Sequence, residues 1–277
     1  MRIDRIESAV TKRTMTCFST VLGKWVNHAL AFLLLCVVTV GVEHQSAWSQ
    51  PPAGLRQAVD IGSAALAKGD RPAAIAAADT LLRDFGDEPA AWRLAGDLYL
   101  RAGAAEKAVP QFRRYIEKNP QAEPELWQHG IALAFVGEYD AGRKLFELHR
   151  TVNPNDVENA LWHYYCIAKA GSSEAARLAI LPAPGDRRVP MNELLKLYRG
   201  EADEAAVRAA VATLPAGSAQ AEMAGYYADL YLAMHAEALG QRDRALELAT
   251  KAAEIEMVNY MTDVGRDYQR RLRAAAP

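Results

Sequence analysis

Apolar residues recur at helical spacing along most of the chain after residue 50, and we find no long alternating Val/Ile/Thr/Tyr run of the kind that predicts strands. In the stretch LAGDLYLRAG, residues 94–103, Leu94 and Leu98 predict one apolar helix face, yet Gly96 and Gly103 interrupt the pattern. Glycine inside a helix costs about 1 kcal/mol relative to alanine. Two glycines in so short a segment therefore need a structural reason.

The reason is a repeat with a period of 34 residues. Two registers of glycines, one of small residues and one of mostly large apolar residues recur at this spacing: Gly62, Gly96 and Gly130; Gly69, Gly103, Gly137 and Gly171; Ala74, Ala108, Gly142 and Ala176; Ala78, Phe112, Phe146 and Ile180. Asn119-Pro120 also recurs as Asn153-Pro154. Several registers that agree indicate a true repeat.

Each repeat unit predicts a pair of antiparallel helices. The first glycine register falls in the middle of the first helix, where a missing side chain lets the partner helix approach closely. The second register ends that helix, where a positive φ is easiest for glycine. The small register lies in the second helix, and the proline that follows ends it.

The period and these residue types resemble the tetratricopeptide repeat family over residues 55–154. The fullest copy runs from Pro89 to Gln121, and its signature positions are Trp92, Gly96, Tyr99, Gly103, Ala108, Phe112 and Pro120. The resemblance implies an all-α solenoid of about six helical hairpins in a right-handed superhelix, with repeats starting near residues 55, 89, 123 and 157. The alternative is a compact all-α domain of another kind.

The organisation that follows has three segments: 1–49, a leader; 50–180, the repeat array; and 181–277, degenerate repeat-like hairpins. LPAPGDRR, residues 181–188, interrupts the helical pattern and predicts an exposed loop. NYMTDVGRDYQRRL, residues 259–272, predicts a final helix that caps the apolar end of the stack.

The leader carries basic residues, then an apolar run from Ala29 to Val42, then small and polar residues. This order is a secretory signal pattern, with cleavage expected after Ser49. An uncleaved membrane anchor is the alternative, and either interpretation places the body in the periplasm or outside the cell. A lipid anchor is not expected, because Cys36 follows Leu35 in the middle of the run.

Charge and motifs exclude several functions. The net charge is −2 without a basic stripe, which argues against a nucleic-acid partner. The chain has no recognisable hydrolase, phosphate-loop or zinc motif, so we expect no enzyme, no cofactor and no metal. Cys166 is the one cysteine after the leader; it lies three residues after His163, and both are interpreted as packing residues.

Through the resemblance, the concave face of the array is expected to bind a partner. The positions that it assigns to this groove are Arg93, Asp97, Arg101, Trp127, Ile131, Phe135, Tyr165 and Lys169. The arginines suit carboxylates of a partner, and the aromatic residues suit its apolar side chains. The alternative is internal: the aromatic residues pack against the next repeat, and the arginines are solvated or pair with Asp97.

The function expected is an exported adaptor that binds a protein or peptide of the cell envelope. The second half also distantly resembles a family of periplasmic tetratricopeptide-repeat lipoproteins, whose members scaffold a tail-specific protease and cell-wall hydrolases. Two alternatives remain at this point: a structural subunit of an envelope assembly or secretion complex, and a non-catalytic accessory of a cell-wall hydrolase.

Overall fold

A computed structural model describes residues 53–275, and the leader therefore lies outside the described residues. The described part is helical and contains no strand. Its elements are α1 (Ala53–Ala67), α2 (Arg71–Phe85), α3 (Pro89–Arg101), α4 (Ala105–Lys118), the 3₁₀ helix η1 (Pro120–Glu125), α5 (Trp127–Phe135), α6 (Tyr139–His149), α7 (Val157–Ala170), α8 (Ser173–Leu178), α9 (Met191–Arg199), α10 (Glu204–Val211), α11 (Ala219–Ala238), α12 (Arg242–Ala253) and α13 (Tyr260–Ala274).

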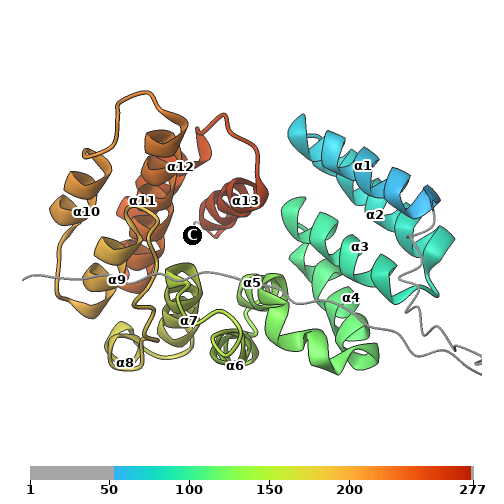
Figure 1. Cartoon of the computed structure of the whole chain (residues 1–277), viewed down its shortest axis with the longest axis horizontal. Helices are drawn as coiled ribbons and strands as arrows, with labels where there is room; N and C mark the ends of the chain where they lie inside the picture. Colours follow the sequence, from blue (N-terminus) through green and yellow to red (C-terminus); the bar gives the residue numbers. More distant parts are fainter. Residues whose placement is uncertain (1–52, 276–277) are drawn as a thin grey trace, which may run out of the picture. The chain divides into compact units, whose positions relative to one another are not determined.

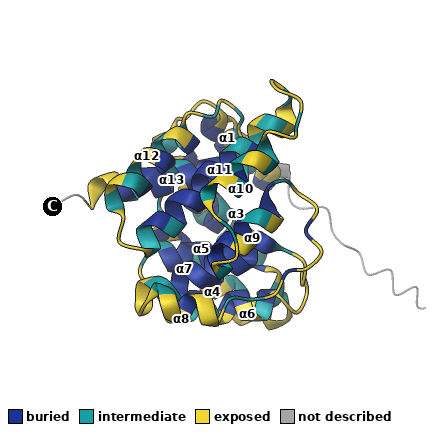
Figure 2. Ribbon diagram, turned by 90° about the vertical axis from the view of Figure 1, so that its left-hand side faces the viewer, coloured by how far each residue is buried: buried dark blue, intermediate teal, exposed yellow. Residues whose placement is uncertain are grey.

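Consecutive helices pair as α1–α2, α3–α4, α5–α6, α7–α8, α9–α10 and α11–α12, and neighbouring pairs contact one another. The described residues thus form an all-α solenoid of six helical hairpins followed by α13. They belong to one compact unit, without a division near residue 180. Figure 2 shows the buried residues on inner helices such as α5 and α7, and exposed residues on α8.

The first glycine register forms notches between paired helices. A Cβ added at Gly96 would lie 2.7 Å from Phe112 Cε1, and one at Gly130 would lie 2.7 Å from Phe146 Cζ. At Gly62 the second helix offers only the small Ala77 and Ala78, and Leu98 of the next pair fills the notch instead. A large apolar side chain therefore fills each notch, and the helix that carries this side chain can approach the glycine closely.

The second glycine register makes the turns within the pairs. Gly69, Gly103 and Gly137 have φ of 70°, 76° and 82°. Gly171 differs, because it ends α7 with φ −146° and ψ −91°. There Ser172 follows at once as the N-cap of the short α8, so the chain turns without a left-handed residue.

The loop at residues 181–188 is not simply exposed. Ala183 and Asp186 are buried, and Asp186 accepts a hydrogen bond from the backbone N–H of Val157 at the start of α7. The expectation of an exposed loop is therefore wrong for these two residues. The Asp186 carboxylate binds the N-terminus of α7, and this contact holds the loop against the array.

The final helix does more than cap the stack. It packs on α12, as a cap would, but it also contacts α3 on the opposite side of the solenoid. Figure 1 shows α13 between the α11–α12 pair and α3. Its buried residues are Met261, Thr262, Asp263, Val264, Gly265, Asp267, Tyr268, Gln269 and Leu272. With that many buried positions, α13 is part of the interior of the described unit.

The notch at Gly96 predicts a specific loss of stability. Gly96→Ala should lower the free energy of unfolding by about 1–3 kcal/mol, because the new methyl group meets the fully buried Phe112 ring. Gly225→Ala in α11 is the matched control, because a Cβ there meets nothing within 4 Å. It should be neutral or gain up to about 1 kcal/mol from helix propensity. Denaturant unfolding of both variants measures this, and equal effects would contradict the notch.

Candidate functional site: the concave face and its own helix

The inner residues of α3 meet the start of α13. Tyr260 donates a hydrogen bond from its hydroxyl to Asp97 Oδ1 at 3.0 Å. Arg101 Nε donates to Asp263 Oδ2 at 2.9 Å, and both side chains are largely buried, with 19% and 5% of their surface exposed. Charge-assisted hydrogen bonds of this kind, away from water, fix the position of α13 against α3.

An aromatic contact extends this junction to α5. The Trp127 ring meets the Tyr260 ring edge-on, with 4.9 Å between the centroids. The guanidinium carbon of Arg101 lies 5.5 Å from the centre of the same Tyr260 ring. Tyr260 therefore touches three residues that the sequence assigned to the groove: Asp97, Arg101 and Trp127.

The other half of the predicted groove meets Glu237 at the end of α11. Glu237 accepts hydrogen bonds from Tyr165 at 3.1 Å and from Tyr268 of α13 at 2.8 Å, and Lys169 Nζ lies 2.6 Å away. One carboxylate thus joins α7, α11 and α13. Burial of its two tyrosine donors raises their pKa well above 10.

Two further groove positions lie in apolar surroundings. Phe135 packs edge-on against Trp162, with centroids 5.7 Å apart, and the Arg271 guanidinium of α13 lies 4.9 Å from its ring centre. Ile131 is 1% exposed. Arg93 is exposed, and its charge acts on Asp97 and Tyr260.

The structure therefore brings most of the predicted groove residues together around the chain's own α13. Phe135 packs against Trp162 of the next repeat, whereas Trp127 and Tyr165 contact tyrosines of α13. Arg101 pairs with Asp263 of the same chain and not with Asp97. Tyr260, Asp263 and Glu237 were not among the predicted groove residues, although Asp263 and Asp267 share one helical face and complement the arginines.

Burial at this junction changes the protonation of Asp97. Desolvation raises the pKa of Asp97 to about 6, although the Tyr260 hydrogen bond and the charges of Arg93 and Arg101 oppose the change. The pKa of Asp263 is also raised, again mainly by burial and against the attraction of Arg101. Both carboxylates are therefore costly to ionise in the folded chain.

Part of the concave face stays open beside α13. A cavity of about 200 Å³, here named the aromatic cavity, lies between α5, α6, α7 and the first turn of α13. Its lining residues are Trp127, Ile131, Phe146, Asp156, Glu158, Asn159, Trp162, Arg188 and Met261. Two of these, Trp127 and Ile131, were predicted groove positions.

The charged side of the aromatic cavity is an ion-pair network. Arg188 pairs with Asp156 at 2.7 Å and Asp186 at 2.6 Å, and it also contacts Glu158. Tyr231 of α11 donates to Glu158, whose pKa is raised by burial. The network fixes the loop around residue 188 over the cavity and gives the cavity a polar edge.

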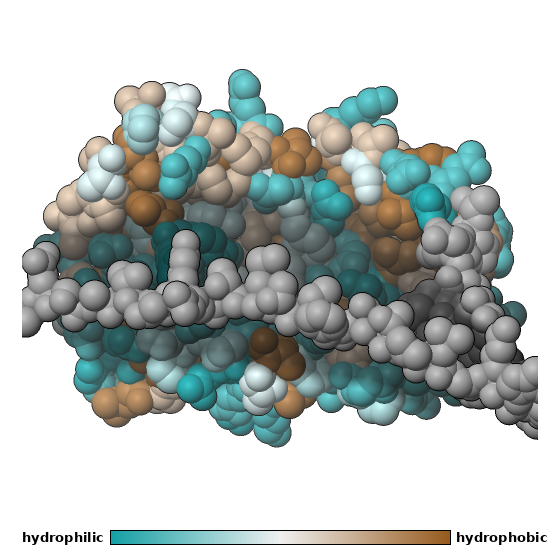
Figure 3. Space-filling view, viewed as in Figure 1, coloured by the Kyte–Doolittle hydropathy of each residue, from teal (hydrophilic) through white to brown (hydrophobic). Residues whose placement is uncertain are grey.

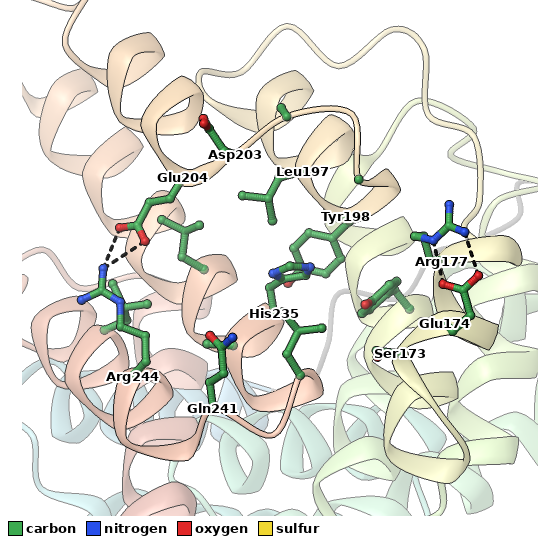
Figure 4. A pocket seen from close by; sticks show the side chains of 17 residues that line it. Ser173, Glu174, Arg177, Leu197, Tyr198, Asp203, Glu204, His235, Gln241 and Arg244 are labelled. Carbon is green, nitrogen blue, oxygen red and sulfur yellow. Dashed lines mark hydrogen bonds and ion pairs between the residues drawn. The ribbon is translucent and has the colours of Figure 1, made fainter.

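A larger cleft of about 440 Å³ opens in the second half, between α7–α8, α9 and α11–α12 (Figure 4). The rings of Tyr198 and His235 lie 4.8 Å apart in it, and burial lowers the pKa of His235 to about 4. Two ion pairs, Arg177–Glu174 at 2.7 Å and Arg244–Glu204 at 2.8 Å, lie at its edges. Its charged groups are thus largely paired with one another.

The described residues offer little for metal or redox chemistry. Residues 53–275 contain no group of three or more His, Cys, Asp or Glu side chains arranged to hold a metal ion. Cys166 is buried, and burial raises the pKa of its thiol to about 12, so the reactive thiolate is disfavoured. His163 is buried beside Glu147, with 3.2 Å between Nε2 and Oε1. Within the same residues, no helix is both long and apolar enough to cross a membrane.

Paired helices with notched interfaces, stacked into a curved array, define a helical-repeat scaffold. Residues 59–123 match the family model of the tetratricopeptide repeat, so this part of the chain is tetratricopeptide-repeat sequence. No curated protein matches the chain. Members of this repeat family generally bind protein partners and are typically non-catalytic, which makes a protein-interaction scaffold the class that fits this chain.

The raised pKa of Asp97 predicts a pH dependence. The folded chain holds this proton more tightly than the unfolded chain, so the contribution of Asp97 to wild-type stability falls as the pH rises from about 4 to about 6. Asp97→Asn cannot ionise, and its stability relative to wild type should therefore increase by on the order of 1 kcal/mol over this window. Urea unfolding at both ends of the window measures the change.

The exposed Asp87 provides the control for this experiment, because Asp87→Asn removes a carboxylate outside the groove. A relative stability of Asp97→Asn that falls with rising pH would mean that the arginines outweigh burial at this site.

Proposed function

We propose that this chain is an exported adaptor that binds a protein or peptide of the cell envelope through the aromatic cavity of its concave face. The repeat family supports a protein partner. The basic, apolar and polar order of residues 1–49 supports export. The observation that carries the proposal is an open cavity with aromatic walls between α5, α6, α7 and the first turn of α13.

The aromatic cavity suits one apolar or aromatic anchor from a partner. Trp127, Phe146 and Trp162 provide aromatic walls, and Ile131 and Met261 complete the apolar lining. Large side chains that enter such desolvated sites contribute most of the affinity at protein interfaces. The network around Arg188 and Glu158 lies at the edge, where it favours a partner that places polar groups beside its anchor.

Partner capture tests the cavity. The full chain, tagged at its C-terminus, is used to capture proteins from an envelope extract of cells that produce it. Trp127→Ala should reduce recovery of the partner at least about tenfold, because an aromatic hot spot is worth 2 kcal/mol or more. Tyr115→Ala in α4 is the control, since it removes a half-buried aromatic residue from a second helix.

The capture experiment is decisive only if α13 stays docked. Hydrogen exchange of α13 in Trp127→Ala checks this, because Trp127 contacts Tyr260. Equal recovery by wild type and Trp127→Ala would remove the aromatic cavity as the binding site. Recovery of a large complex of fixed stoichiometry that neither substitution reduces would favour a structural subunit of an envelope assembly.

Export has its own test. Mass spectrometry of the protein from the producing cells should find Gln50 as the first residue, because Ala47 and Ser49 provide the small residues that precede a cleavage site. Replacement of Ala47 by Arg should block the cut and leave the leader attached. An intact leader in the wild-type protein would instead favour a membrane anchor.

A further inference from the structure

Another opening lies where the first two helix pairs meet α13. It has a volume of about 270 Å³ and is here named the arginine pocket. Its lining residues are Leu66, Ala67, Gly69, Arg71, Arg101, Glu256, Val258, Asp263, Arg266 and Arg270. They come from the α1–α2 turn, the end of α3, the segment before α13, and α13 itself. The pocket is separate from the aromatic cavity, since the two share no lining residue.

The lining of the arginine pocket has more positive than negative groups. Four guanidinium groups face two carboxylates, Asp263 and Glu256. Asp263 already pairs with Arg101 at 2.9 Å and with Arg266 at 3.4 Å. Glu256 is exposed. The carboxylates within the lining therefore do not balance its positive charge.

Two of the guanidinium groups converge beside the turn glycine Gly103. A Cβ added at Gly103 would lie nearest to Asp267 Oδ1, and it would lie 2.6 Å from Arg71 Nη2 and 2.9 Å from Arg270 Nη2. Arg71 is held there by its Nε, which donates to the Ala102 carbonyl oxygen at 2.6 Å. Arg270 contacts Asp267 at 3.2 Å, but Asp267 also pairs with Arg271 at 2.7 Å. The positive charges of Arg71, Arg270 and Arg271 therefore lie close together. The Asp267 carboxylate is shared by Arg270 and Arg271.

Arg270 has an unused donor. Its Nε is buried and lacks a hydrogen-bond partner among the described residues. A buried donor of a charged group without an acceptor is costly, and a bound acceptor would relieve that cost. Burial is the main cause that lowers the pKa of Arg270; the charges of Arg71 and Arg271 act in the same direction, and Asp267 opposes them.

We propose that the arginine pocket binds an oxyanion, a carboxylate or a phosphate group, held by Arg71, Arg101 and Arg270. Guanidinium groups present paired donors that match these two anions. The three arginines belong to α2, α3 and α13, so the bound anion joins the first two helix pairs to the last helix. The arginine pocket binds this anion whether or not the aromatic cavity binds a partner.

Titration calorimetry of the full chain at constant ionic strength tests the site, with inorganic phosphate in one series and glutarate in another. Saturable binding of one equivalent is expected in at least one series, and the series that gives tighter binding identifies the preferred source of the oxyanion. Arg270→Gln should weaken that binding about tenfold, because it removes one charge-assisted hydrogen-bonding group. Glu256→Gln should strengthen it about threefold, because it removes a nearby like charge.

Arg273→Gln is the matched control, since it removes the same charge from an exposed position of the same helix outside the pocket. It should leave the affinity unchanged. No saturable binding in either series, or an equal loss in Arg270→Gln and Arg273→Gln, would overturn the proposal. Should Arg270→Gln unfold, the exposed Glu256→Gln decides the outcome: an unchanged affinity overturns the site and a tighter one supports it.

Discussion

The docking of α13 against α3 is the contact on which the rest of this structure depends. It places Asp263, 5% exposed, and Asp267, 3% exposed, in the interior. Buried carboxylates are tolerated only when they are paired, and Arg101 and Arg271 provide the pairing. Because Arg101 belongs to an early helix and Asp263 to the last one, this pair joins the two ends of the described residues. Tyr260 strengthens the same junction through Asp97 and Trp127.

The array reaches this closed arrangement through its repeated notches. At Gly96 and Gly130 a phenylalanine from the paired helix occupies the missing side-chain volume, so each pair packs closely. At Gly62 the second helix has alanine in place of phenylalanine, and Leu98 from the following pair fills the space. The same glycine register therefore supports contacts within pairs and between them. Gly103 has a further role, because its missing Cβ leaves room for Arg71 and for Arg270 and Asp267 of α13.

The position of α13 also determines which surfaces are left for ligands. It contacts inner residues of α3, α5 and α7, which a repeat scaffold usually presents to a partner. It leaves two openings, and it lines both: Met261 belongs to the aromatic cavity, and Asp263, Arg266 and Arg270 belong to the arginine pocket. The first opening is aromatic and the second is rich in arginine. A partner of this chain would therefore meet a concave face that its own last helix has already shaped.

The sequence by itself determined the helical pairs, their period and the two kinds of glycine, because close packing and left-handed turns are local demands that recur in every repeat. It also selected residues that do gather on the concave face, such as Asp97, Arg101 and Trp127. Only the tertiary structure decided what they contact. Asp263 lies 162 positions after Arg101, and local periodicity carries no information about a pairing at that separation. The same limit applies to the arginine pocket, whose lining residues come from α1, α2, α3 and α13.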